Sequence, residues 1–137
     1  MSDCVFCKIV AGQIPSTRVY EDELVLAFMD IGEVNPGHVL VALRPHAENL
    51  FALDDAQAAA VAKACARIAR AIRAAFKPAG LSVYQANGAA AGQTVFHYHV
   101  HLVPRHDGDR MAFTWPVNSP PRDQLEAHAA KIRAALA

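Results

Sequence analysis

The chain has 137 residues, of which 53% are hydrophobic and 19% are charged, a size and composition typical of one compact domain with a single core. Because 13 lysines and arginines balance 13 aspartates and glutamates, no general positive field is available to hold a nucleic acid or an anionic membrane, and neither is expected as a partner. The sequence has no apolar run long enough for a signal peptide or a bilayer span, and its three cysteines do not form the pattern of a disulfide framework, so we expect a cytoplasmic protein.

A pair of cysteines, Cys4 and Cys7, stands near the start of the chain with two residues between them. Such a pair can ligate one metal ion, but a structural zinc site needs four ligands, and the sequence has no second C-x-x-C motif. On spacing alone, two small core residues are the simpler interpretation. A thioredoxin-like redox pair is weaker still, because no βαβ pattern surrounds the two cysteines.

Three strands are predicted in the first third of the chain. The acidic turn at 21–23 separates the apolar residues 19–20 from 24–29, a pattern typical of two antiparallel strands. A strong turn at 35–37 then precedes the nearly continuous apolar run 38–43, which predicts an interior strand. Asp30 lies at the end of the second strand, and His38 and His46 flank the third.

A long helix is predicted from about residue 54 to residue 77. Its apolar residues recur at intervals of three and four, acidic residues precede it, and a proline and a glycine follow it. We expect Cys65 to lie in the core on this helix. Residues 81–86 predict a further strand, which forms a hairpin with the segment beginning at residue 97, and residues 122–136 predict a C-terminal helix.

Histidine and apolar residues alternate from 96 to 103, the pattern of a half-buried strand. The three histidines His97, His99 and His101 therefore share one face, which lines a cleft or meets solvent. The apolar residues that we expect to cover the core on the other face are Phe96, Tyr98, Val100 and Leu102.

This spacing favours acid–base or covalent chemistry over one shared metal ion. Side chains two residues apart on a strand are roughly 6.7 Å apart, so His97 and His101 are separated by about 13 Å at the backbone, whereas zinc ligands lie about 2 Å from the ion. Two neighbours can converge on one ion, but three cannot easily do so. The imidazoles can instead act separately on an anionic substrate, as nucleophile, proton carrier and oxyanion contact. The glycine-containing linker 87–94 can point N–H groups at the same anion.

The segment 97–103 matches the histidine triad pattern, His-φ-His-φ-His-φ-φ with φ apolar, and on this basis the chain resembles the histidine triad (HIT) superfamily of nucleotide hydrolases and transferases. The resemblance extends from Cys4 to about Arg105. Within the superfamily, the chain is most similar to bacterial members of the Hint-like branch. Its further motifs are Cys4-x-x-Cys7-Lys8-Ile9, Gly12-x-Ile14-Pro15, Val19-Tyr20-Glu21-Asp22, Leu26-Ala27-Phe28-x-Asp30-Ile31, Pro36-Gly37-His38-x-Leu40-Val41, Asn87-Gly88 and Ala91-Gly92-Gln93-x-Val95-Phe96.

The resemblance implies an α+β fold, with a five-stranded, mainly antiparallel sheet, a long helix and the C-terminal helix, usually doubled into a homodimer. We expect residues 1–137 to form a single HIT domain, with a core at about 4–105 and a C-terminal extension at 106–137. The implied nucleophile is His99, which attacks the α-phosphorus of a nucleotide to give a nucleotidyl-imidazole that water hydrolyses. His101 resembles the residue that contacts the phosphate oxygens, and His38 resembles the upstream member of the proton network.

Ligand-binding residues are also implied by the resemblance. Asp30 matches the carboxylate that binds the ribose hydroxyls. The positions of the purine base pocket are Val5, Phe6, Ile9, Ile31 and Leu40, and those of the phosphate-binding loop are Asn87, Gly92, Gln93 and Thr94. Thr94 stands where the phosphoramidate-hydrolysing eukaryotic relatives carry serine.

A structural zinc ion is a further implication, because bacterial relatives with this cysteine pair bind zinc with two histidines. The four ligands here are Cys4, Cys7, His46 and His97. The resemblance therefore favours metal ligation by the cysteine pair, whereas the spacing alone favours two small core residues. No catalytic metal is expected.

The expected substrate is a purine nucleoside 5′-phosphoramidate or an aminoacyl-adenylate, and the second choice is a dinucleoside polyphosphate. Two different classes stay open, a nucleotide-binding adaptor with residual hydrolysis and a metal-binding protein. One departure from the relatives is the segment Leu43-Arg44-Pro45-His46, which keeps a positive charge but moves the proline.

Overall fold

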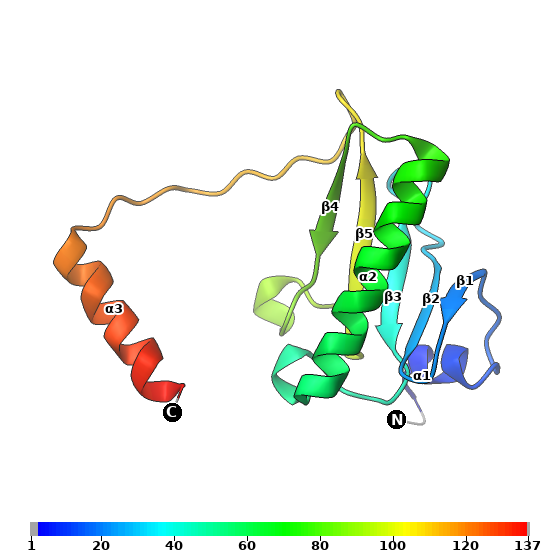
Figure 1. Ribbon diagram of the computed structural model, residues 1–137, viewed down its shortest axis with the longest axis horizontal. Coiled ribbons are helices and arrows are strands. Elements are labelled where there is room, and N and C mark those ends of the chain that lie inside the picture. Colours follow the sequence, from blue (N-terminus) through cyan, green and yellow to red (C-terminus); the bar gives the residue numbers. More distant parts are fainter. Residues whose placement is uncertain (1–2, 137) are drawn as a thin grey trace.

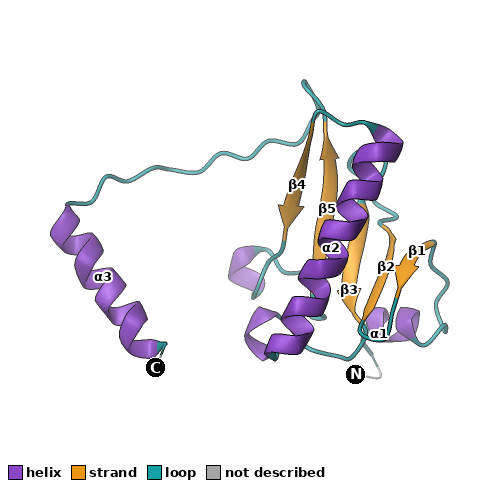
Figure 2. Ribbon diagram, in the orientation of Figure 1, coloured by secondary structure: helices purple, strands orange, loops and turns teal. Residues whose placement is uncertain are grey.

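A five-stranded antiparallel sheet with the strand order β1-β2-β3-β5-β4 forms the body of the computed structural model, which describes residues 3–136. The strands are β1 (Arg18–Glu21), β2 (Val25–Met29), β3 (Val39–Leu43), β4 (Gly80–Tyr84) and β5 (His99–Arg105). The α-helices are α1 (Val5–Val10), α2 (Asp55–Phe76) and α3 (Arg122–Ala135). α2 crosses one face of the sheet (Figures 1 and 2), so the predicted α+β fold is confirmed.

The central strands are buried on both faces, which explains their nearly continuous apolar sequences. On the α2 side, Val25, Val41 and Leu102 belong to the larger core cluster. On the other side, Phe6 and Ile9 of α1 pack with apolar residues of β2 and β3. α1 was not predicted from the sequence. It is a short helix whose first N–H groups are partly satisfied by the Cys4 side chain, which accepts from the Cys7 amide.

α2 has the boundaries that its sequence predicts. The Asp54 side chain accepts from the Gln57 amide while the Gln57 side chain accepts from the Asp54 amide, a capping box that defines the first turn. Lys77 ends the helix in the left-handed conformation at φ +50°. The residues that the helix buries against the sheet are Val61, Ala64, Ile68 and Ile72, and Cys65 packs partly buried at the edge of this cluster.

β4 and β5 form the predicted hairpin, but the histidine segment differs from the prediction at its start. The regular strand begins at His99, and the preceding residues pair with the segment after β3, since the Tyr98 N–H donates to Ala47 O. Phe96 is 39% exposed and does not cover the core, so that part of the prediction was wrong. His97 lies fully buried beneath α1 instead of facing a cleft.

The chain beyond β5 leaves the body as an extended arm that leads to α3 (Figure 1). α3 buries no residue, although it matches the helix predicted for 122–136. Within the described residues 3–136, no helix is both long and apolar enough to cross a membrane.

Candidate active site

An apolar cavity of about 370 Å³ lies on the face of the sheet opposite α2, with His99 and His101 of β5 in its wall. Asp30, directly after β2, and Thr94, before β5, complete its polar rim. All five expected base-pocket residues line the cavity. Val5, Phe6, Ile9 and Leu40 form its walls together with Ile31, which is fully exposed to solvent. Further lining residues, which belong to the motifs of the resemblance but were given no binding role from the sequence, include Ile14, Phe28 and Val95.

The three triad histidines occupy chemically different positions, because a backbone carbonyl fixes the proton on His97 and on His99, whereas the His38 side chain fixes it on His101. His97 Nε2 lies 2.6 Å from Leu43 O and must donate to that carbonyl, which leaves Nδ1 with its lone pair. Nδ1 faces the Cys4 and Cys7 thiols at 3.3 and 3.5 Å. Burial lowers the pKa of His97, so the ring is neutral. This histidine is therefore placed to ligate a metal and has no access to the cavity.

His99 has the opposite arrangement. Its Nδ1 lies 2.7 Å from His97 O and donates to it, which leaves the Nε2 lone pair free. Burial lowers the pKa of His99, although the bond to the His97 carbonyl partly opposes the shift. The Phe6 ring packs edge-on against the imidazole, with the ring centroids 4.9 Å apart. The result is a neutral, fixed imidazole with an available nitrogen nucleophile.

His101 receives its proton arrangement through His38. The Val34 amide donates to His38 Nδ1 at 3.1 Å, so the proton of neutral His38 is on Nε2. That nitrogen lies 3.0 Å from His101 Nδ1 and 3.3 Å from Asp30 Oδ2. His101 Nδ1 therefore accepts, and its own proton lies on Nε2. Burial, together with the neighbouring His99 and His38, lowers the pKa of His101 to about 4.

Asp30, His38 and His101 also lie close enough together to be considered as a metal site. A metal ion on His38 Nε2 would have to displace the ring proton while Nδ1 still accepts from the Val34 amide. The ring would then be an imidazolate, which costs far more than a neutral ligand. The cluster of Asp30, His38 and His101 is therefore better suited to share a proton than to bind a metal ion.

The second cluster of possible ligands contains Cys4, Cys7, His46 and His97, the four residues of the expected zinc site. Cys7 Sγ lies 3.3 Å from His46 Nδ1, close to the separation of about 3.5 Å between sulfur and nitrogen ligands around tetrahedral zinc. His97 offers a lone pair to this site because its other nitrogen is committed to Leu43 O. The residues thus fit zinc, which would connect α1, the segment after β3 and the start of the histidine segment.

The linker between β4 and β5 is organised by its own amide side chains. Buried Gln93 donates to Glu48 O and Val95 O and accepts from the Gly88 amide. Asn87 bonds with Gln85 and accepts from the Leu50 amide. These two side chains shape the loop from within. Gly92, at φ +93°, has Tyr84 Oη where a side chain would begin, and Thr94 is the loop residue that reaches the cavity.

Replacing His101 with glutamine is expected to make stability less sensitive to acid. The pKa of His101 is about 4 in the folded protein, against about 6.5 in an unfolded chain, so between these values only the unfolded state binds the proton. Stability from this group is complete above pH 6.5 and declines as the pH falls toward 4, by up to about 1.4 kcal/mol per pH unit. Urea unfolding of both proteins at pH 7, 6 and 5 measures the difference. A difference that does not change with pH would contradict this account.

Comparison with known proteins places this geometry in a family. The HIT domain model matches residues 11–108. The protein hit of Bacillus subtilis is 49% identical over 118 residues, which cover 85% of this chain and 81% of that protein. The adenylylsulfatase HINT3 of Arabidopsis thaliana is 35% identical over 111 residues, covering 79% of this chain and 55% of that protein.

Solved structures agree with the fold. A HIT family protein from Bacillus anthracis is 42% identical, with a TM-score of 0.93 over 97% of this chain and 96% of that chain. A Zn-bound histidine triad family protein from Mycobacterium smegmatis is 38% identical, with a TM-score of 0.76 over 98% of each chain.

Proposed function

The chain belongs to the HIT family of nucleotide-binding hydrolases and transferases, and from this premise we propose that it hydrolyses a purine nucleoside 5′-phosphoramidate or an aminoacyl-adenylate at the α-phosphate. The observation that carries the proposal is the orientation of His99. Its Nδ1 is held by a backbone carbonyl, so its Nε2 lone pair is available at the wall of a cavity large enough for a purine nucleoside.

The reaction proceeds in two displacements. His99 Nε2 attacks the α-phosphorus, and the bond to the leaving group breaks with its electron pair departing on the leaving group, whose nitrogen, in a phosphoramidate, takes up a proton from solvent. Positive charge that develops on the imidazole is stabilised by the hydrogen bond from Nδ1–H to His97 O. Water then attacks the phosphorus of the nucleotidyl-imidazole and releases a proton to solvent, the P–N bond breaks with its electron pair returning to Nε2, and neutral His99 is restored.

His101 stabilises the charge on the phosphate. Because its Nδ1 accepts from His38, its Nε2–H is the donor available to a non-bridging phosphate oxygen. Asp30 Oδ1 accepts from the Gly32 amide, while Oδ2 lies at the rim shared by the cavity and the His38–His101 pair. In the proposal this carboxylate also receives the ribose hydroxyls.

The walls of the cavity favour a leaving group with little negative charge. Among the described residues that line it, none is a lysine or an arginine. A polyphosphate leaving group would bring several negative charges that only local cations could offset. An amine or an aminoacyl group needs no such cations, which supports the phosphoramidate or aminoacyl-adenylate over a dinucleoside polyphosphate.

Adenosine 5′-phosphoramidate is therefore expected to be hydrolysed with a kcat/KM at least about tenfold above that of diadenosine polyphosphates, a difference of about 1.4 kcal/mol in transition-state binding. The two substrates are compared side by side, with and without a chelator that leaves the bound zinc in place. A preference for the polyphosphate would select the second substrate class. Tight nucleotide binding with negligible turnover on both would indicate an adaptor.

Adenylyl sulfate belongs in the same assay, because the Arabidopsis relative is an adenylylsulfatase. Sulfate is a compact anion that requires a hydrogen bond donor on the leaving-group side. Thr94, which lines the cavity and carries a hydroxyl, is the candidate for that contact. Loss of sulfate release with unchanged phosphoramidate hydrolysis in Thr94→Val would identify it.

A structural zinc ion on Cys4, Cys7, His46 and His97 completes the proposed site. Free thiols that serve as metal ligands persist in a reducing compartment, which supports placing the protein in the cytoplasm. A homodimer is also proposed, since β4 is an edge strand of the sheet and its Val83 side chain is 63% exposed.

A further inference from the structure

Tyr84, the last residue of β4, lies beside the triad histidines although the sequence gave it no role. It pairs with His101 of β5 across the antiparallel ladder. Residues that pair in this way carry their side chains on the same face of the sheet. The Tyr84 side chain therefore lies on the face opposite α2, where the cavity is.

The ring of Tyr84 packs against the imidazole of His101. The two ring centroids are 5.8 Å apart, with 58° between the planes, a separation at which aromatic rings attract one another. His38 and His99 lie against the same imidazole, each with its ring centroid 5.2 Å away. The direction of the His101 Nε2–H bond thus depends on the Tyr84 ring as well as on the hydrogen bond from His38.

The hydroxyl of Tyr84 holds a turn of the linker that follows β4. Tyr84 Oη donates to Ala91 O at 3.2 Å. This carbonyl ends the short 3₁₀ turn Ala89–Ala91, and the last carbonyls of a helix have no donor within the helix. Gly92 follows at φ +93°, and a Cβ there would lie 3.2 Å from Tyr84 Oη. Glycine at this position permits the close approach of the turn to the hydroxyl.

The turn leads directly into the part of the linker that reaches the ligand. Buried Gln93 anchors the linker from within the protein, and Tyr84 anchors it from the exposed side. Thr94 follows and lines the cavity together with His101. None of residues 88–92 is among the described residues that line this cavity. The bond from Tyr84 therefore acts on a ligand through the placement of the residues after the turn.

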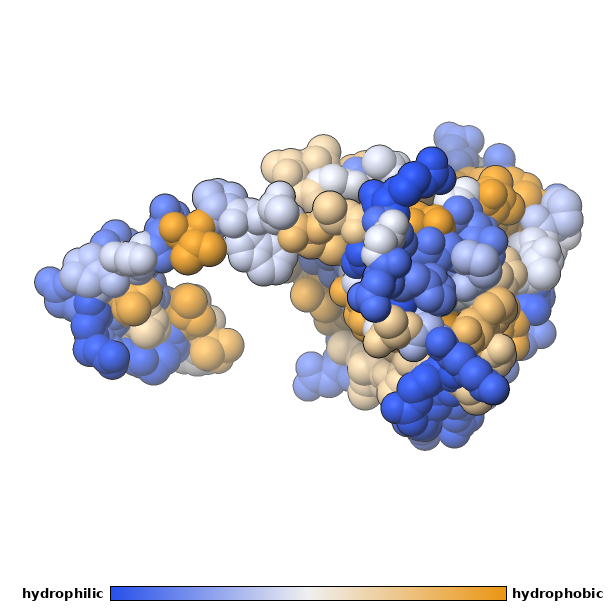
Figure 3. Space-filling view, turned by 90° about the horizontal axis from the view of Figure 1, so that it is seen from above, coloured by the Kyte–Doolittle hydropathy of each residue, from blue (hydrophilic) through white to orange (hydrophobic). Residues whose placement is uncertain are grey.

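The surroundings of Tyr84 allow its contribution to be removed without damage to the core. Phe113, at the start of the arm, stacks on the Tyr84 ring with the centroids 6.2 Å apart and 28° between the planes. The arm beyond it leads away from the body (Figure 3). Tyr84 belongs to neither of the two core clusters. Conservative replacements at this position are therefore expected to fold.

We propose that Tyr84 is a positioning residue for the phosphate of the nucleotide: its ring orients His101, and its hydroxyl places the linker that carries Thr94. The inference rests on the function proposed above, in which His101 donates to a phosphate oxygen. It adds that one side chain aligns the two parts of the phosphate site, β5 and the linker. The two contributions are separable, because phenylalanine at this position lacks only the hydroxyl, whereas leucine lacks the ring as well.

The first test measures the binding of adenosine 5′-monophosphate and of adenosine to full-length, zinc-loaded protein by calorimetric titration. Tyr84→Phe is expected to weaken binding of the monophosphate about fivefold, the equivalent of about 1 kcal/mol for one hydrogen bond. Binding of adenosine is expected to stay within about twofold of the wild type, since the walls of the cavity are unchanged. A general loosening of the structure would instead weaken both ligands.

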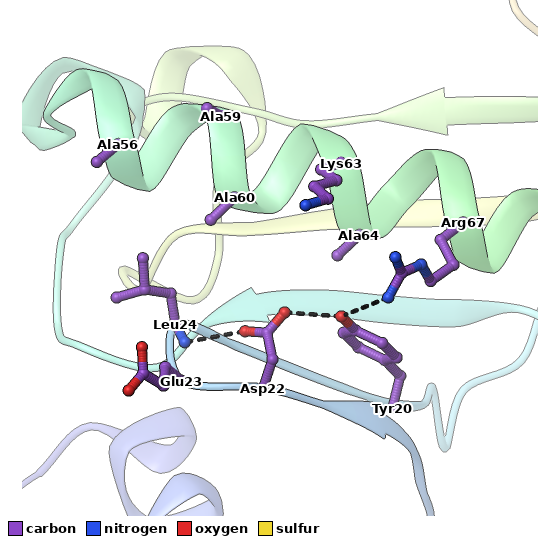
Figure 4. Close-up of a pocket in the computed structure, with 10 residues that line it drawn as sticks. All are labelled: Tyr20, Asp22, Glu23, Leu24, Ala56, Ala59, Ala60, Lys63, Ala64 and Arg67. Atoms are coloured by element: carbon purple, nitrogen blue, oxygen red, sulfur yellow. Dashed lines mark hydrogen bonds between the residues drawn. The ribbon is translucent and has the colours of Figure 1, made fainter.

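Tyr20→Phe is the matched control for the loss of a tyrosine hydroxyl. The Tyr20 hydroxyl bonds with Asp22 and Arg67 in the groove between α2 and the β1–β2 turn, on the other face of the sheet (Figure 4). This variant is expected to bind both ligands like the wild type. The inference would be overturned if Tyr84→Phe lost affinity for both ligands equally, or for neither.

The second test separates the ring from the hydroxyl during hydrolysis of adenosine 5′-phosphoramidate. Tyr84→Phe is expected to raise KM with kcat within about twofold of the wild type, because the lost bond weakens the ground state and the transition state alike. Tyr84→Leu is expected to lower kcat about tenfold as well, because His101 loses a neighbour that orients its donor. Equal kcat values in the two variants would overturn the role of the ring. A wild type that does not hydrolyse the phosphoramidate would refute the proposed substrate, and the binding comparison would still decide the role of Tyr84.

Discussion

His99→Ala is expected to lower turnover by about 10³-fold or more while nucleotide binding stays close to that of the wild type. The substitution removes the only triad nitrogen whose lone pair is available at the cavity, since His97 Nδ1 faces the thiols and His101 Nδ1 accepts from His38. The apolar walls and Asp30 remain to hold the ligand. Single-turnover kinetics and calorimetric titration with adenosine monophosphate measure the two effects separately.

The covalent step has its own direct test. Wild-type protein quenched during turnover is expected to carry a nucleotidyl adduct on His99, detected by mass spectrometry of the peptide. In His99→Gly, added imidazole can occupy the vacated space and is expected to restore part of the turnover. An adduct on His97 or His101, or near-normal turnover in His99→Ala, would show that the nucleophile is wrongly assigned.

Cys4→Ser is expected to abolish stoichiometric zinc and to lower the melting temperature by about 10 °C, equivalent to about 3 kcal/mol. Zinc would join α1 to the segment after β3 and to the start of the histidine segment. The body of the sheet keeps its two core clusters, so the variant is expected to fold. Elemental analysis and calorimetry on protein purified without chelator give both values.

Cys65→Ala is the matched control for this prediction. It removes the third thiol, which lies on α2, partly buried against the larger core cluster, and whose pKa is raised to about 11 by burial. It is expected to lose some core packing but to retain one zinc ion per chain. Equal zinc contents in Cys4→Ser and the wild type would contradict the assignment of the metal site.

The secondary structure was predictable wherever one physical signal dominated. α2 has a helical apolar period and a capping box, and β2 and β3 have continuous apolar sequences typical of interior strands. The β4–β5 hairpin follows from its glycine-containing linker. α1 escaped prediction because six residues are too few to establish a period.

The candidate site was predictable in membership but not in the orientation of its groups. Alternation placed His97, His99 and His101 on one face, yet it could not show that α1 covers the first of them. The tautomers depend on carbonyl and amide groups of Leu43 and Val34, which carry no sequence signal because every residue has them. The internal bonds of Asn87 and Gln93 likewise appear only in three dimensions.

The alternating faces of β5 have a consequence for how this chain can vary over evolution. Val100 and Leu102 belong to the core beneath α2, while His99 and His101 face the cavity, so substitutions on one face leave the other untouched. Single substitutions on the cavity face can therefore change substrate specificity without loss of folding. A one-residue insertion or deletion in the strand would exchange the faces, burying imidazoles under α2 and exposing valine and leucine to the ligand. Relatives are expected to differ freely in the residues around this strand but to keep its length.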